Sequence, residues 1–289
     1  MKYAFGVCIM NYKIVSDSSS NLWFIENTDY TCVPLTIRTD EKEYVDDSDL
    51  DVAGMVDALK TYKGKSGTAC PSVGDWLAAF DGADRVFAVA ITSGLSGSYN
   101  AACEAAKIYK EENPDKDVMV IDSLSAGPEL ALIIEKLQDL IQQELPFETI
   151  CTKITKYQRR IHLLFSLESV NNLARNGRVS PVVAKMVGLL GIRIVGKASD
   201  EGTLETLSKS RGEKNAIAKV WEYMKEMGFS GAKVRIAHCF NKEAAEALKE
   251  MILSAFPKSN IHICACTGLC SFYAEKGGLM IGFEHGTND

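Results

Sequence analysis

The chain has 289 residues, of which 46% are hydrophobic and 24% are charged, and its formal net charge is -6. These proportions are typical of a globular protein with a sizeable core and room for two domains. The negative charge argues against non-specific nucleic-acid binding or attachment to an anionic membrane surface, and no apolar run is long enough for a membrane-spanning helix.

Strands and helices alternate through the first half of the chain. Residues 1–10 are only weakly similar to a signal peptide, so we expect the fold to begin near Lys13, with Met10 as an alternative start of the protein. Apolar segments predict strands at 13–16, 32–38, 85–91 and 118–121. Helices are predicted at 21–26, 48–60, 73–80, 100–113, 128–143 and 146–159. This alternation predicts a doubly wound parallel sheet with helices on both faces, a three-layer α/β domain.

The segment before Thr68 contains a Gly-Lys-Ser sequence that invites comparison with a phosphate-binding loop. It lacks the first glycine of that motif, and no strand precedes it. We therefore expect a flexible loop at 62–67, which leads into a short, stiff segment that carries Thr68.

The second half of the chain shows a different pattern. Strands are predicted at 161–165, 192–195, 204–207, 234–237, 261–265 and 278–283, and helices at 167–176, 213–227 and 243–255. A turn at 200–202 predicts a hairpin, and 177–181 is expected to cap a further helix. We predict a mixed-sheet, two-layer α/β domain at 161–289 that follows the parallel-sheet domain at 1–160.

The nine cysteines are odd in number and scattered along the chain. This usage favours free thiols in a reducing cytoplasm. Cys264, Cys266 and Cys270 form the densest group, but their spacing matches no standard zinc pattern. We expect them to be buried structural thiols.

The run Thr-Ser-Gly-Leu-Ser-Gly-Ser at 92–98 joins a buried strand to a helix. Such a connection presents unpaired backbone N–H groups at the positive end of a helix dipole and favours an anion. Ser96 and Ser98 can either cap the helix or turn their hydroxyls toward a ligand.

Several polar residues are expected at the carboxyl ends of the parallel strands, where open α/β sheets bind ligands. They are Asp17, Ser18, Thr68, Ser93, Ser96, Asp122 and Ser123, together with the backbone N–H of Gly97. Hydroxyls dominate this set, and it has no histidine, no clustered lysine and no Walker or Gly-x-Gly-x-x-Gly pattern. A single negative charge, such as a carboxylate, suits it better than a triphosphate. We expect Asp17 and Asp122 to order their loops.

A serine esterase is the alternative interpretation. The segment 94–98 is one residue away from the nucleophile elbow Gly-x-Ser-x-Gly. Ser96 would be the nucleophile, with Asp122 and either His238 or His262 completing the chain order of a triad. The chain has four histidines, and we expect each to be structural or solvated.

The order of the motifs is similar to that of the DegV family, fatty-acid-binding proteins that present acyl chains to a separate kinase. The resemblance covers residues 13–284, nearly the whole chain. Its elements lie at 13–18, 33–35, 43–47, 68–72, 93–98, 122–123, 173–180 and 211–212.

The resemblance implies a long-chain fatty acid between the two domains. Thr68, Ser96, Ser93 and the N–H groups near Gly97 would hold its carboxylate, and residues 186–194 would form part of the apolar wall. Arg178 matches the arginine that is associated with docking the kinase. The family further implies a cytoplasmic carrier linked to phospholipid metabolism. It would have no covalent chemistry, cofactor or metal of its own, no nucleic-acid partner and no stable membrane insertion.

One departure from the family concerns the carboxylate. Many members carry a histidine near the C-terminus in a His-Thr-Gly-Pro-Gly segment, whereas residues 271–278 contain no histidine here. The glycine pair of that segment is retained. Either Tyr273 supplies a substitute hydrogen-bond donor, or the carboxylate is held more loosely than in those members.

Overall fold

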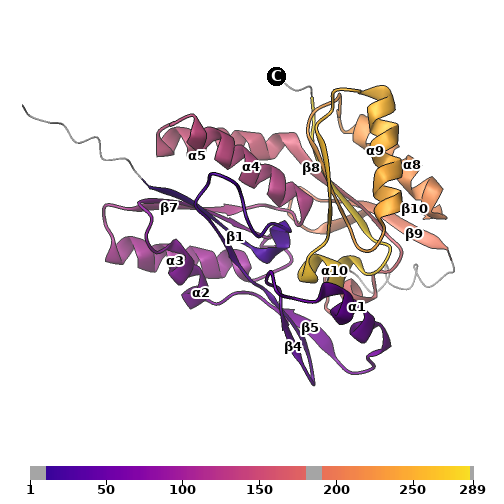
Figure 1. The fold of residues 1–289 in the computed structure, drawn as a ribbon, viewed down its shortest axis with the longest axis horizontal. Coiled ribbons are helices and arrows are strands. Elements are labelled where there is room, and N and C mark those ends of the chain that lie inside the picture. Colours follow the sequence, from indigo (N-terminus) through magenta and orange to yellow (C-terminus); the bar gives the residue numbers. More distant parts are fainter. Residues whose placement is uncertain (1–10, 180–190, 287–289) are drawn as a thin grey trace, which may run out of the picture.

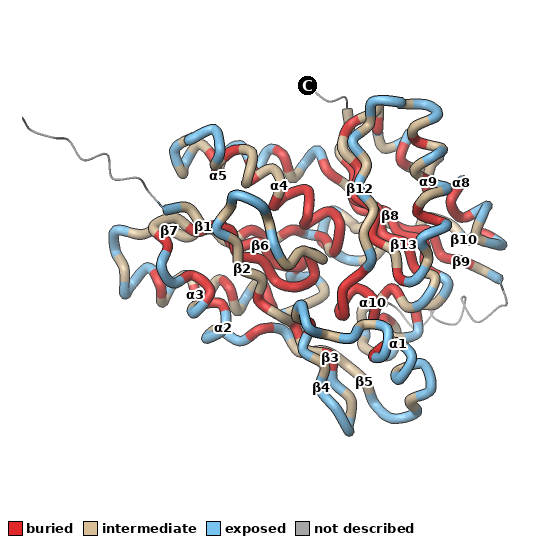
Figure 2. Tube along the Cα trace, viewed as in Figure 1, coloured by how far each residue is buried: buried red, intermediate tan, exposed pale blue. Residues whose placement is uncertain are grey.

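A computed structural model describes residues 11–179 and 191–286. These residues form an α/β fold with a four-stranded, a six-stranded and a three-stranded sheet (Figure 1). The buried residues gather in the two larger sheets and in the helices between and beneath them (Figure 2). The expected α/β class is confirmed. Among the described residues, no helix combines the length and apolar character that a membrane span requires.

The first sheet is wholly parallel, as predicted. Its strands lie in the order β2 (Tyr30–Val33), β1 (Tyr12–Asp17), β6 (Arg85–Ala90) and β7 (Asp117–Asp122). One face is covered by α2 (Val73–Phe80) and α3 (Ser98–Glu112), and the other by α4 (Pro128–Gln142) and α5 (Phe147–Tyr157). In β6, Val86 packs toward α2 and α3 while Phe87 packs toward α4 and α5. Successive side chains of a strand point to opposite faces, which is why a strand buried on both sides is apolar throughout.

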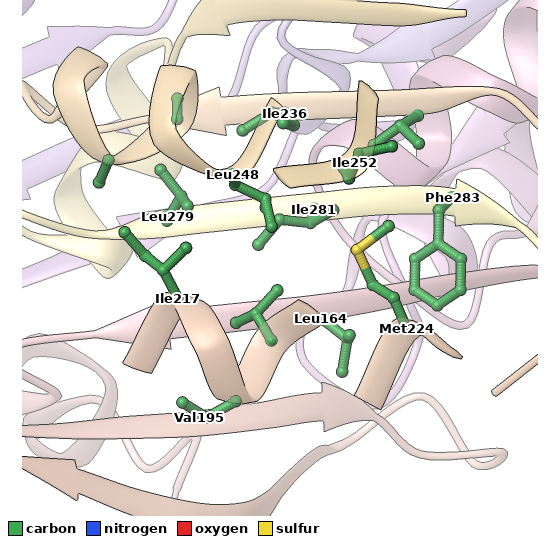
Figure 3. Packing of buried hydrophobic residues seen from close by; sticks show 14 of the residues in the cluster. Leu164, Val195, Ile217, Met224, Ile236, Leu248, Ile252, Leu279, Ile281 and Phe283 are labelled. Carbon is green, nitrogen blue, oxygen red and sulfur yellow. The ribbon is translucent and has the colours of Figure 1, made fainter. Parts of the chain in front are cut away.

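The second sheet is mixed, as predicted. Its order is β10 (Leu204–Arg211), β9 (Ile192–Ala198), β8 (Ile161–Leu167), β13 (Leu279–Glu284), β11 (Val234–His238) and β12 (Ile261–Ala265). β11 and β12 pair in parallel, and the other neighbours pair antiparallel. Leu164, Ile281 and Phe283 point from this sheet into the core beneath α8 (Glu213–Glu226) and α9 (Lys242–Ala255) (Figure 3).

Helix α4 lies between the two larger sheets and contacts both. The contact is close at Gly282 on β13, where a Cβ atom would lie only 2.6 Å from the carbonyl carbon of Pro128. One face of the mixed sheet thus packs on α8 and α9, and part of the opposite face packs on α4, a helix from the first half of the chain. The domain boundary between residues 160 and 161 stays a prediction.

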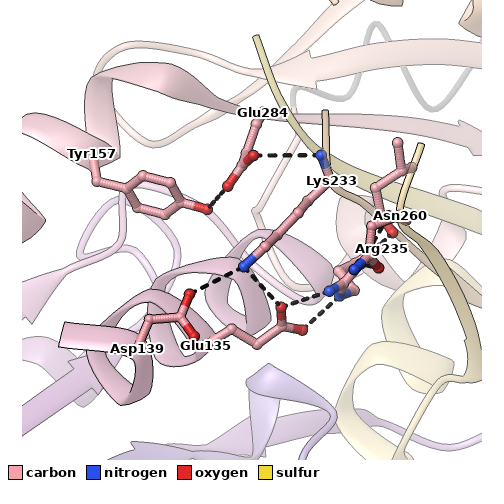
Figure 4. Close-up of polar contacts among 8 residues, drawn as sticks. Glu135, Asp139, Tyr157, Lys233, Arg235, Asn260 and Glu284 are labelled. Carbon is pink, nitrogen blue, oxygen red and sulfur yellow. Dashed lines mark hydrogen bonds and ion pairs between the residues drawn. The ribbon is translucent and has the colours of Figure 1, made fainter. Parts of the chain in front are cut away.

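A polar network fastens α4 to β11 (Figure 4). Arg235, whose exposed fraction is 9%, donates from Nε and Nη2 to the two carboxylate oxygens of Glu135 at 2.5 and 2.6 Å. Lys233 lies 3.3 Å from Asp139 one turn along the helix. A bidentate arginine–carboxylate pair has a defined geometry, so it orients the mixed sheet on α4.

The third sheet is small and was not predicted. It is antiparallel, in the order β4 (Glu43–Val45), β3 (Thr36–Thr39) and β5 (Ser66–Ala69), and lies beside α1 (Val52–Thr61). A helix near the C-terminus, α10 (Gly268–Ala274), packs on β3 and α1 (Figure 1). Phe272 of α10 shares a core cluster with Ile37 and Met55.

Two predicted elements near the N-terminus are wrong. The strand expected at 32–38 is divided between β2 and β3, because the chain leaves the parallel sheet at Pro34, which has no N–H to donate. The helix expected at 21–26 is replaced by one 3-10 turn, η1 (Ser18–Ser20), which ends where Asn21 adopts a φ of 60°. An αL residue terminates a helix instead of extending it.

Further local boundaries differ from the predictions. Helix α1 begins at Val52 and not at residue 48, because the Asp51 side chain caps it by accepting from the N–H of Gly54 at 2.9 Å. Part of the expected loop at 62–67 belongs to β5, so Thr68 stands on a strand. The helix expected at 167–176 is limited to α6 (Asn171–Arg175), because β8 extends to Leu167. The cap at 177–181 and the wall at 186–194 fall partly outside the described residues.

Candidate functional site

An apolar cavity lies where the parallel sheet, the mixed sheet and α10 meet. Its free space is about 680 Å3, which includes open solvent at the mouth. The lining residues come from every part of the fold: Leu35, Thr68, Ile91, Leu95, Ser96, Ala126, Leu163, Phe165, Leu167, Leu173, Arg178, Leu204, Leu269, Cys270, Tyr273, Ala274 and Met280.

The mixed sheet supplies the floor of the cavity. Leu163, Phe165 and Leu167 are alternate residues of β8, so their side chains leave the same face of the sheet. Met280 lies directly across from Phe165 on β13. Leu35 and Ile91 line the cavity from the first half of the chain. The two halves of the protein therefore enclose the apolar space between them.

The polar lining side chains are Thr68, Ser96, Tyr273 and Arg178. The hydroxyl oxygens of Thr68 and Tyr273 lie 2.8 Å apart. The guanidinium carbon of Arg178 lies 5.9 Å from the centre of the Tyr273 ring, within the range of a cation–π contact. Burial raises the pKa of Tyr273, so its phenol stays protonated and can donate a hydrogen bond. Arg178 is the one charged residue in the described lining.

The loop between β6 and α3 brings Ser96 to the cavity. Ser96 Oγ accepts a hydrogen bond from the N–H of Ser98 at 3.2 Å, at the start of α3. Arg178 holds the same loop, because its Nε donates to the carbonyl of Leu95 at 3.2 Å. Ser93 and Gly97 are exposed in this loop and do not line the cavity. A Cβ atom on Gly97 would lie 3.3 Å from the Cys70 sulfur, which shows how closely the loop approaches the segment after β5.

Asp17 lies behind the loop and organises it. Its carboxylate accepts from the N–H of Ile91 at 2.9 Å and from Ser98 Oγ at 2.7 Å, and it also binds Ser19. Asp17 is fully buried, which raises the pKa of its carboxyl group. These contacts join the ends of β1 and β6 to the start of α3. The neighbouring Ser18 accepts from the N–H of Leu35 at 3.1 Å.

Asp122 and Ser123 are also placed behind the site. Asp122 Oδ1 accepts from the N–H groups of Ser93 and Leu124, both at 3.1 Å. Ser123 donates to the carbonyl of Ser125 at 3.0 Å. Neither residue lines the cavity, and both make contacts that order loops.

Two features of the site have no clear signal in the sequence. The first is the position of Arg178 over Tyr273. The second is the contact between Asp46 and the start of α10. Asp46 accepts from the N–H groups of Gly268 at 2.6 Å and Leu269 at 2.9 Å, at the start of α10. Burial raises the pKa of Asp46 to about 6. The acidic segment at 43–47 is visible in the sequence, but its helix partner lies more than two hundred residues away.

The geometry does not assemble the triad of the esterase alternative. His238 accepts from the N–H of Asn241 at 3.4 Å, and His262 is exposed on β12. Neither lines the cavity beside Ser96. The carboxylate of Asp122 accepts hydrogen bonds from two backbone N–H groups, as described above.

The cysteines near α10 form no disulfide with one another; Cys266 and Cys270 are buried as expected, whereas Cys264 is only half-buried. Burial raises the pKa of Cys239 and of Cys264 to about 11, which makes these thiols poor nucleophiles. Within residues 11–179 and 191–286, no three His, Cys, Asp or Glu side chains are grouped so that they could hold a metal ion.

A sequence model described as "Uncharacterised protein, DegV family" matches residues 11–285. The chain belongs to the DegV family. A DegV domain-containing protein of Streptococcus pneumoniae is 44% identical over 279 residues, which cover 95% of this chain and 99% of that protein.

Solved structures of DegV family proteins share the fold. The Streptococcus pneumoniae Fatty Acid Kinase (Fak) B3 protein, loaded with linoleic acid, is 44% identical with a TM-score of 0.94 over 96% of this chain and 100% of that chain. A DegV family protein from Eubacterium eligens, loaded with heptadecanoic acid, is 41% identical with a TM-score of 0.93 over 95% and 100% of the two chains. The resemblance inferred from the sequence motifs is confirmed.

Proposed function

We propose that this DegV family protein binds a long-chain fatty acid in the cavity and presents its carboxylate to a partner fatty acid kinase. The observation that carries the proposal is an apolar cavity whose lining includes three hydroxyls and one guanidinium, with Thr68 and Arg178 both in contact with Tyr273. Two similar proteins hold linoleic and heptadecanoic acid, and one of them is named for a fatty acid kinase.

The acyl tail would lie over the side chains of β8 and β13. Each methylene removed from water contributes about 0.8 kcal/mol, so tail burial supplies most of the affinity. The polar group fixes the orientation of the acid, because a carboxylate left without donors in the apolar part would be costly.

The carboxylate would bind at Thr68 and Ser96, near the first N–H groups of α3. Gly97 would contribute its N–H, and Ser93 would lie at the outer edge of the same loop. Tyr273 takes the place of the missing histidine as a donor, because its hydroxyl already meets that of Thr68. Arg178 adds a positive charge next to the anion.

The protein would act as a cytoplasmic carrier that needs no cofactor or metal and performs no covalent chemistry itself. Phosphorylation would be the work of the kinase. Arg178 remains the proposed docking residue, and its guanidinium lies over Tyr273. A kinase that contacts Arg178 would therefore also contact the mouth of the cavity.

Native mass spectrometry of the protein purified without added ligand, followed by solvent extraction, tests this proposal. We expect a co-purified mass that extracts as a free fatty acid. An empty protein would be titrated with long-chain fatty acids, and failure to bind any of them would refute the proposal. Labelling of Ser96 by a covalent serine probe would instead support the esterase.

A further inference from the structure

The floor of the cavity contains one row of residues with contrasting sizes. Phe165 and Met280 are directly paired across β8 and β13, and both face the cavity. In the same row, Gly196 is the partner of Phe165 on β9, and Ala237 is the partner of Met280 on β11. Two bulky side chains are thus flanked by two small residues.

The Phe165 ring occupies the space that a side chain at Gly196 would take. A Cβ atom on Gly196 would lie 2.3 Å from Phe165 Cζ. Gly127, at the start of α4, stands in the same relation to Met280, because its Cβ atom would lie 2.6 Å from Met280 Cε. Ordinary carbon–carbon contacts are about 3.5–4.0 Å, so both large side chains rest against a glycine backbone.

We propose that Gly127 and Gly196 determine which acyl chains fit the cavity. Because these two residues have no side chain, Met280 and Phe165 can pack against their backbone and leave the cavity open. A side chain at either glycine would push the methionine methyl or the phenylalanine ring out of its place. The free space available to a displaced group is the cavity, because packed interiors hold few other voids. This inference rests on the proposed fatty-acid binding and concerns the length of chain that is accepted.

Gly127 is the better position for a test. A side chain at Gly196 would also meet the carbonyl of Glu205 at 2.4 Å, which would disturb the β9–β10 hairpin. At Gly127 the close contact is the mobile end of Met280, but φ is 63°, so alanine is strained there. Gly82→Ala is the matched control, because Gly82 has a φ of 81° and nothing lies within 4 Å of its Cβ position.

The experiment measures the affinities of dodecanoic, hexadecanoic and eicosanoic acid by displacement of a fluorescent fatty acid. For Gly127→Ala we expect the preference for the longer acids over dodecanoic acid to fall by about fourfold for each methylene that no longer fits. Gly82→Ala should keep the parent's ratios. Equal ratios in Gly127→Ala and Gly82→Ala would overturn the inference.

A smaller side chain on the floor of the cavity gives an independent test, which does not require a strained substitution at Gly127. Phe165→Leu should shift the preference toward eicosanoic acid. Phe283→Leu is its control, because Phe283 is buried in the core on the opposite face of the same sheet. An unchanged ratio in Phe165→Leu would contradict the inference even if Gly127→Ala does not fold. A parent protein that binds none of the three acids would refute the proposed function itself.

Discussion

The hydroxyl oxygens of Thr68 and Tyr273 lie 2.8 Å apart, although 205 residues separate them in the chain. Thr68 stands on the small antiparallel sheet and Tyr273 on α10, so the hydrogen bond joins the two halves at the polar end of the cavity. A proton shared between two hydroxyls leaves one further donor for a ligand. This arrangement supports the proposed carboxylate site.

Tyr273→Phe should weaken fatty-acid binding and leave the fold intact. The substitution removes the proposed hydrogen bond to the carboxylate, worth about 1 kcal/mol or roughly fivefold in affinity. Isothermal titration with hexadecanoic acid measures the change. Tyr62→Phe is the control, because Tyr62 is not a lining residue of the cavity. Equal affinities for the parent and Tyr273→Phe would exclude this role.

Thr68→Val and Ser96→Ala should reduce phosphorylation of the bound acid more than they reduce its binding. Both changes remove hydroxyls that we propose orient the carboxylate, while the apolar side chains that line the cavity are untouched. The measurement is the rate of acyl phosphate formation with a fatty acid kinase, set beside the affinity from titration. Thr28→Val serves as the control, because Thr28 is a half-buried loop residue that does not line the cavity. Unchanged rates in both variants would count against the assigned roles.

Asp46→Ala should destabilise the protein and loosen α10. The substitution leaves the buried N–H groups of Gly268 and Leu269 without their acceptor, at a cost of about 2–4 kcal/mol in the free energy of unfolding. Urea denaturation measures this cost, with Asp49→Ala, an exposed position, as the control. Fatty-acid affinity should fall as well, because α10 supplies Tyr273. A free energy equal to that of the control would show that Asp46 does not anchor the helix.

Glu129 should make the stability of the protein depend on pH. It is buried in α4, and in the part of the chain that the structure describes its Oε2 atom has no hydrogen-bond partner. Burial raises its pKa from 4.5 to about 8. A carboxyl group whose pKa is raised in the folded state stabilises the fold at low pH, and this contribution is lost as the pH rises through about 8.

The variant Glu129→Gln isolates this effect, because it mimics the protonated group and does not titrate. Between about pH 6 and about pH 9 the parent should lose about 2–3 kcal/mol of stability relative to Glu129→Gln. Thermal unfolding of both proteins across this range provides the measurement. Glu144→Gln is the control at an exposed position. Parallel pH profiles for the parent and Glu129→Gln would show that Glu129 is not protonated at neutral pH.

Much of the architecture follows from the sequence alone. The apolar segment at β6 and the glycine- and serine-rich run that follows it predict a buried parallel strand, a turn and a helix, since each depends on the preferences of a few adjacent residues. The same reasoning places Asp17 and Asp122 at strand ends, where their side chains bind loop N–H groups. Sequence reasoning also found Thr68 and Ser96, which both line the cavity.

The tertiary structure alone decides how these elements meet. The prediction missed α10 and the small sheet, because a short helix that is buried almost throughout and a short strand that is uniformly half-buried carry little periodic signal. It could not show that Asp46 caps α10 or that Arg178 covers Tyr273, because such pairs form between segments far apart in the chain. Phe165 and Gly196 become neighbours only when β8 pairs with β9. Local preferences reside in adjacent residues, whereas the cavity depends on which distant surfaces pack together and exclude water.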